Sequence, residues 1–397
     1  MPTGEQFPWK NIDFKAQPEA YLRALLAYGI KVNGTDAIDW RIEDNTSEHW
    51  CHAPWFHNAR ERIHGMTPER GSRLKELHRL QLSRASNWAV GFYNSIGCYA
   101  LGSVWNDPAF PKTKGMHFPD GSYSIKLLFT TASPSQVPYL TGSKIWNAAI
   151  GNDGSSVPMR LLQVDVAVRD TAADDFTGWL FGTFIYDAST AGGTVWERLV
   201  PVGLMWGNDP QLTTRSYEEQ GKDPIEGWYN PVVAERFYPL PRHNLGLHGR
   251  VNGPVDNSKS ACLACHSRAL DWGRAVLRNS PQQEEAEVLL PLAPNPYDDA
   301  AVRHYFRNLK SDQPFVAGTQ SLDYSLQLAI GITNFRSWVQ TNHPDQSSST
   351  TDVPPYRFKA DDQNFDLLSS LYFQGLRNAA GALSARETYA PFARGEE

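Results

Sequence analysis

The feature that most constrains this chain is the pentapeptide Cys262-Leu263-Ala264-Cys265-His266, a C-x-x-C-H motif. Thiols three residues apart lie on the same side of a helical turn, and the next residue follows directly beside them. With this spacing, two cysteines attach a haem through thioether bonds and the histidine binds its iron. The motif therefore predicts one covalently attached haem c, held by Cys262 and Cys265, with His266 as the iron ligand.

Two other chemistries use paired cysteines. A redox-active dithiol is expected in a βαβ unit, and a zinc site needs a second pair of ligands. Here the segment 253–260 before the motif is a polar turn rather than a strand, and the other two cysteines, Cys51 and Cys98, are distant in the sequence. Haem attachment is the favoured interpretation, with the zinc and dithiol sites as alternatives.

Composition narrows the class of protein further. The formal net charge of -6 over 397 residues leaves no basic surface for nucleic acid, and no apolar run approaches the ~18 to 20 residues of a membrane span. Haem is attached to such motifs outside the cytoplasmic membrane, so we expect an exported or periplasmic protein whose leader lies outside this sequence. In an oxidising compartment Cys51 and Cys98 could pair, or they could remain two buried thiols; the sequence leaves both open.

The hydrophobic pattern predicts an α+β fold, in which an antiparallel haem-binding β-sheet core is surrounded by N- and C-terminal helices and long loops. We expect three regions, at 1–105 (helical and irregular), 106–280 (β-rich) and 281–397 (helical). Predicted helices cover 18–29, 67–84, 262–277, 299–310, 321–340 and 362–384. Predicted strands, joined as an antiparallel meander by short connections, cover 122–129, 161–170, 178–186 and 196–205, and a long loop region covers 207–257.

Two of the predicted strands carry a charged residue in the middle. Alternation places Lys126 on the more polar side of the strand 122–129. Asp165 stands among apolar residues in the strand 161–170, where an unpaired carboxylate would be costly. One explanation is an ion pair between Lys126 and Asp165 across neighbouring strands, which would only fix the strand register.

The order of these features resembles the cytochrome P-460 family and its cytochrome c′-β relatives. A Phe118-Pro119-Asp120-Gly121 turn leads into a strand with Lys126, Asp165 precedes Val168-Arg169-Asp170, and Gly178-Trp179-x-Phe181 comes before the haem motif. The resemblance covers residues 115 to 275. Leu127 stands where the family commonly has a glutamate, and Asp165 stands at the position of its distal glutamate.

The resemblance implies that Lys126 and Asp165 lie on the distal side of the haem. There Asp165 would accept or deliver protons, and Lys126 would orient a ligand or attach to the porphyrin edge. It implies an oxidoreductase that acts on a small nitrogen compound or a peroxide at an open iron position.

Two alternatives stay open. One is a six-coordinate electron-transfer cytochrome that serves a redox partner protein, and the other is a nitric-oxide or carbon-monoxide binding protein with an apolar pocket. The sixth iron ligand, where one is present, would come from the methionine and histidine side chains outside the motif: Met116, Met159, Met205, His243, His248, His304 or His343.

Overall fold

The alternating segments of the sequence form the centre of one antiparallel sheet. The structure is a computed structural model, and it describes residues 6–33, 50–52, 61–106, 111–151, 154–233, 245–271 and 298–342. Its strands are β1 (Trp50–His52), β2 (Thr67–Ser72), β3 (Ala85–Asn94), β4 (Tyr123–Thr130), β5 (Ile145–Ala148), β6 (Val157–Arg169), β7 (Trp179–Tyr186), β8 (Leu199–Met205), β9 (Gly227–Tyr229), β10 (Leu270–Asp271) and β11 (Gln320–Ser321). Its α-helices are α1 (Pro18–Asn33), α2 (Ser95–Val104), α3 (Thr214–Glu218), α5 (Cys262–His266), α7 (Asp299–Tyr305) and α8 (Leu326–Asn342).

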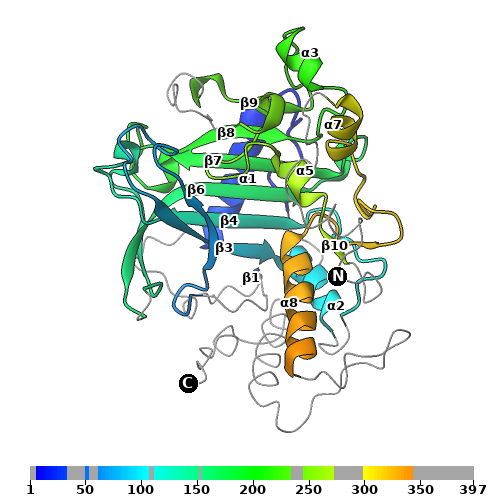
Figure 1. Ribbon diagram of the computed structural model, residues 1–397, viewed down its shortest axis with the longest axis horizontal. Coiled ribbons are helices and arrows are strands. Elements are labelled where there is room, and N and C mark those ends of the chain that lie inside the picture. The colour runs from blue at the N-terminus through cyan, green and yellow to red at the C-terminus, as the bar shows by residue number, and fades with distance from the viewer. Residues whose placement is uncertain are drawn as a thin grey trace.

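Among the described residues, nine strands form the main sheet in the order β1-β3-β4-β6-β7-β8-β9, with β2 paired to β3 and β5 paired to β6 (Figure 1). The pairs β6–β7 and β7–β8 are antiparallel. The predicted antiparallel sheet with accompanying helices is therefore confirmed, as are the central strands. The fourth predicted strand begins later than expected, at Leu199, because a short 3-10 turn occupies residues 196–198.

One face of the sheet is covered by α1, which crosses behind the strands in Figure 1. Leu22 and Leu25 of α1 are fully buried in the same core as Ile125 and Val166 of the sheet. Gly182 of β7 permits this close contact, because a Cβ atom at that position would overlap with Leu22. Apolar side chains on every second residue of β4, β6 and β7 therefore explain why this helix lies on the sheet.

A second apolar core covers the opposite face, where α5 lies in front of the strands in Figure 1. It joins the sheet to the haem-motif helix and to segments near the C-terminal end of the described chain. Its members include Ala167, Phe181, Met205, Leu263, Ala264, Val302, Phe306, Leu322 and Leu328. The residues after 298 thus pack on the same face as the motif.

The helix predicted at 67–84 is wrong. Residues 67–72 form β2 and pair with β3, and turns follow up to β3. Leu77 is fully buried, whereas Leu74, Leu80 and Leu82 are exposed, so these leucines do not share one packing surface. Gly71 weakens a helix near its start, and the distant strand β3 offers the backbone its hydrogen-bond partners instead.

Other predicted boundaries also shift. The first helix does not stop at Gly29 but continues to Asn33, because this glycine serves close packing: a Cβ atom there would overlap with the hydroxyl of Tyr123. The motif helix ends at His266, because residues 270–271 form β10, which pairs with β11. The region 1–105 contributes β1, β2 and β3 to the sheet, and the predicted loop 207–257 contains α3 and β9.

The C-terminal helices agree in part. Helix α7 begins at the predicted residue 299 and ends at Tyr305, and α8 begins at Leu326 because β11 and a turn occupy residues 320–325. The predicted helix at 362–384 and the continuation of the motif helix from 272 to 277 lie outside the described residues.

Cys51 and Cys98, whose pairing the sequence left open, form a disulfide between β1 and α2. Their Cα atoms are 6.1 Å apart, within the range that a disulfide can bridge. The bond ties the edge of the sheet to the helix that follows β3.

Candidate functional site

The motif helix α5 is a single turn that packs on β7. Its apolar residues Leu263 and Ala264 are buried in the second core, which fixes the orientation of the turn. The thiols of Cys262 and Cys265 are not disulfide-bonded, and both residues are partly accessible. The turn therefore carries two neighbouring thiols that are partly accessible, while its apolar residues are buried.

His266 is held by the backbone of a distant segment. Its Nδ1 lies 2.9 Å from the carbonyl oxygen of Tyr324, and its ring centre lies 4.6 Å from that of Phe181. Because a carbonyl oxygen only accepts hydrogen bonds, Nδ1 carries the hydrogen and Nε2 keeps its lone pair. Burial lowers the pKa of His266 to about 4, so the imidazole is neutral at neutral pH. A neutral imidazole with one nitrogen bonded to a carbonyl is the usual form of a metal-binding histidine.

The two thiols differ from the activated thiols of a redox-active dithiol. Burial raises the pKa of Cys262 and raises the pKa of Cys265 to about 12. A reactive dithiol needs a lowered pKa, because the thiolate is the nucleophile, so the raised values disfavour that alternative. In the part of the chain that the structure describes, no group of three or more histidine, cysteine or acidic side chains could hold a metal ion.

A polar row crosses the middle of the sheet on the same face as α5. Lys126 of β4 is opposite Asp165 of β6, and Asp165 is opposite Thr183 of β7. The ammonium of Lys126 lies 3.6 Å from Asp165 Oδ2 and 3.4 Å from Glu69 Oε1. Glu69, on β2, was not anticipated from the sequence. The predicted ion pair between Lys126 and Asp165 is thus present, and a second carboxylate joins it.

The charges of this row depend on one another. Burial works against the charge on Lys126, but the Glu69 and Asp165 carboxylates outweigh it and raise the pKa of Lys126. Burial raises the pKa of Asp165 even though the Lys126 ammonium acts in the opposite direction. Lys126 is therefore a firmly protonated cation, while Asp165 holds a proton more readily than an ordinary aspartate.

The loop before the motif brings a third carboxylate, Asp256, which the sequence did not single out. Asp256 acts on the pKa values of both motif cysteines and of His266, so it lies close to all three. Arg70 of β2 holds this loop: its Nε donates to the carbonyl oxygen of Val255 at 2.6 Å. The hairpin that provides Glu69 thus also positions the loop in front of the motif.

All five residues predicted for the site lie in one region. Lys126 and Asp165 are close enough to Cys262 to influence its pKa, and Cys262, Cys265 and His266 share one turn. Although they lie in the middle of a nine-stranded sheet, the side chains of Lys126 and Asp165 are 35% and 23% exposed. This exposure shows that solvent reaches the polar row. The His266 imidazole and the two thiols, which form no disulfide, fit the covalent attachment of a haem.

The predicted candidates for a sixth iron ligand differ in their position relative to the motif and in their existing contacts. Met116 and Met205 are buried in the same core as the motif, whereas Met159 belongs to the core on the other face of the sheet. His248 is already engaged, since its Nε2 lies 2.8 Å from Thr214 Oγ1. His304 lies on an exposed surface beside Arg307, and His243 and His343 lie outside the described residues.

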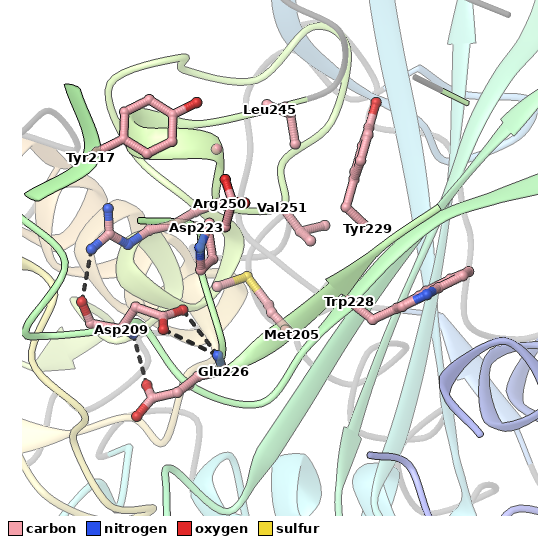
Figure 2. A pocket seen from close by; sticks show the side chains of 14 residues that line it. Met205, Asp209, Tyr217, Asp223, Glu226, Trp228, Tyr229, Leu245, Arg250 and Val251 are labelled. Carbon is pink, nitrogen blue, oxygen red and sulfur yellow. Dashed lines mark hydrogen bonds between the residues drawn. The ribbon is translucent and has the colours of Figure 1, made fainter. Parts of the chain in front are cut away.

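A cavity of about 230 Å³ adjoins the motif, between the ends of β8 and β9 and the loop before α5 (Figure 2). Met205, Trp228, Tyr229, Leu245 and Val251 form its apolar and aromatic wall. The wall is connected to the motif, because the Cys262 amide donates to the carbonyl oxygen of Val251.

The charged residues of this cavity hold the surrounding loops together (Figure 2). Arg250 donates to the carbonyl oxygen of Asp209 at 2.8 Å, and Asp209 Oδ1 accepts from the amides of Ile225 and Glu226. Glu226 in turn accepts from the Asp209 amide and from Asn308. Because these groups are bound to one another and to the backbone, the motif remains the candidate site.

Comparison of the chain with protein-family models, with curated proteins and with solved structures found no match. Within the described residues, no helix combines the length and the apolar character needed to cross a bilayer.

Proposed function

We propose that this chain is an exported c-type cytochrome with one covalently attached haem, built like the P-460 family, that oxidises or reduces a small nitrogen compound or a peroxide. The observation that carries the proposal is the His266 imidazole, tied through Nδ1 to the Tyr324 carbonyl beside two unpaired thiols on the same turn. This arrangement leaves Nε2 as the free nitrogen. The disulfide Cys51–Cys98 supports an oxidising compartment.

Cys262 and Cys265 would hold the haem through thioether bonds, and Nε2 of His266 would bind its iron. When bound, the haem supplies an iron centre that exchanges electrons and can bind a small ligand. The protein provides the covalent attachment, the orientation of the imidazole and the polar groups over the sheet.

Asp165 and Lys126 are the groups proposed to act on the substrate. Because burial raises its pKa, Asp165 can accept a proton at Oδ2 and return it. The Lys126 ammonium can donate hydrogen bonds to an oxygen or nitrogen of the bound molecule while Glu69 balances its charge. Both groups project from strands of a rigid sheet, which suits the precise positioning that proton transfer requires.

A second candidate function is electron transfer. Met116 and Met205 are buried in the same core as the motif, and a methionine sulfur there could complete a six-coordinate iron. A gas-binding protein with an apolar pocket fits less well, because the partly exposed groups near the motif are the charged Lys126 and Asp165.

The first experiment produces the chain with an export leader in a host that attaches haem c, and measures the intact mass and the pyridine spectrum. Wild type is expected to carry one haem, and a C262S/C265S variant none. A C51S/C98S variant is the matched control, because it loses the same two sulfurs elsewhere and should still carry haem. A wild-type chain without haem would refute the proposal.

The second experiment separates the candidate functions on the haem-loaded protein. A broad, high-spin spectrum together with turnover that falls about 100-fold in D165N supports catalysis. Asp187→Asn, at a buried aspartate directly after β7, is the control and should keep its turnover. Sharp low-spin bands without added ligand would instead support electron transfer.

A further inference from the structure

Asp323 is a completely buried carboxylate that accepts four hydrogen bonds. Its Oδ2 accepts from the amide of Phe118 at 2.6 Å. Its Oδ1 accepts from Trp179 Nε1 at 3.0 Å, Ser311 Oγ at 2.7 Å and the amide of Asp312 at 3.2 Å. Four donors satisfy both oxygens and compensate for the burial of the charge. The side chain therefore links the turn before β4, the first residue of β7 and the segment before β11.

The backbone at Asp323 is held in an unfavourable conformation. Asp323 and Tyr324 have φ angles of 46° and 67°, in the left-handed region that residues other than glycine rarely occupy. Two such residues in succession persist only where the surroundings enforce them. Here the Asp323 carboxylate anchors one residue, and the hydroxyl of Tyr324 donates to the carbonyl oxygen of Leu309 at 2.7 Å to anchor the other.

This enforced turn presents the Tyr324 carbonyl to His266. The carbonyl oxygen lies 2.9 Å from His266 Nδ1, and the Tyr324 ring packs beside Phe181, which also contacts the imidazole. Removing the anchor would let the backbone relax toward ordinary φ angles and turn the carbonyl away. The imidazole would then lose the contact that fixes its tautomer and its orientation.

We propose that Asp323 is a positioning residue for His266: it forces the turn at 323–324 that fixes the imidazole with Nε2 free. The expectation that Nε2 binds iron rests on the proposed function. The connection from Asp323 through the Tyr324 carbonyl to His266 does not depend on haem. The turn at 323–324 would then be part of the site, although Tyr324 lies 58 residues after His266 in the sequence.

The test begins with the full chain without haem, labelled with ¹⁵N-histidine and studied by NMR, with His266→Gln used to assign the signal. Wild type is expected to show a single neutral tautomer of His266 with hydrogen on Nδ1. Asp323→Asn should give a mixture of tautomers, because an amide cannot accept all four bonds. Trp179→Phe removes one donor but keeps an aromatic ring, so it gives a smaller change in the same direction and serves if D323N does not fold.

The matched control is Asp170→Asn. Asp170 is equally buried and accepts bonds from Tyr21 and Lys10 on the α1 side of the sheet. It should lower thermal stability without altering the His266 signal. An unchanged tautomer in both D323N and W179F, or the same change in D170N, would overturn the inference.

The haem-loaded chain provides the second readout. Loss of an outer partner typically weakens a metal ligand 10- to 100-fold. In D323N the pH at which acid releases His266 from the iron should therefore rise by about one unit, as followed by the optical spectrum, and D170N should match wild type. A wild-type chain that carries no haem would refute the proposed function alone, because the NMR result still decides the role of Asp323.

Discussion

Replacing Lys126 by methionine tests whether the polar row is coupled as the structure shows. Lys126 lies between two carboxylates, 3.4 Å from Glu69 and 3.6 Å from Asp165. Methionine fills a similar volume without the charge. The K126M variant therefore leaves the carboxylates of Glu69 and Asp165 without the cation that lies near both.

The expected cost follows from burial. Fully exposed ion pairs contribute about 0–1 kcal/mol, and removal of one partner from a buried pair costs about 3–5 kcal/mol. Lys126 and Asp165 are 35% and 23% exposed, so K126M should lower the free energy of unfolding by about 2 kcal/mol. In the K126M/D165N double variant only the more exposed carboxylate, that of Glu69, remains unpaired, and about half of that loss should be recovered.

The measurement is denaturant unfolding of the haem-free full chain for wild type, K126M, D165N and the double variant, which together give the coupling free energy between the two residues. We expect a coupling of about 1 kcal/mol. Lys114→Met, at an exposed lysine, is the control and should change stability by less than about 0.5 kcal/mol. Additive effects of K126M and D165N would refute the conclusion that these two side chains form one electrostatic unit.

Three further outcomes are expected. Reduction of Cys51–Cys98, or the C51S/C98S variant, should lower the free energy of unfolding by about 4 kcal/mol, because the bond closes a long loop between cysteines 47 positions apart. Unfolding with and without reductant measures this loss. Burial lowers the pKa of His248 to about 4. As the pH falls, His248 is therefore protonated in the unfolded chain before it is protonated in the folded chain, and the free energy of unfolding should fall by up to about 3 kcal/mol between pH 6.5 and 4. Unfolding at a series of pH values should show a smaller decline in His248→Asn. Gly182→Ala should destabilise the fold by about 1–3 kcal/mol through overlap with Leu22, and a smaller residue at 22 should restore part of it in thermal unfolding.

The central strands could be predicted from the sequence because their signal is local. Alternation predicted the two strands that carry Lys126 and Asp165, and the register places these residues directly opposite each other. The C-x-x-C-H spacing likewise identified the helical turn α5. In each case the pattern of side chains along a few residues contains the information.

The remaining parts of the site depend on contacts between distant segments, which no local pattern records. Glu69 was assigned to a helix because the leucines that follow it have helical spacing, but pairing with β3 decided the structure. Gly71, two residues after Glu69, was the available signal against a helix. Tyr324 acts on His266 through a backbone carbonyl, an atom that every residue has, so its sequence gave no indication of that role.

The polar row is difficult to explain by stability alone. The rows beside Asp165 and Lys126 on this face are mixed: they contain the apolar Ala167, Phe181, Leu128 and Ile185 and the polar Ser124 and Gln163, and Gln163 donates to Asp165. Replacement of a buried ion pair by apolar residues of similar size is often neutral or stabilising. An apolar row would therefore serve the fold as well. Because the charged row instead keeps polar, partly exposed groups near the motif, its position supports the proposed function.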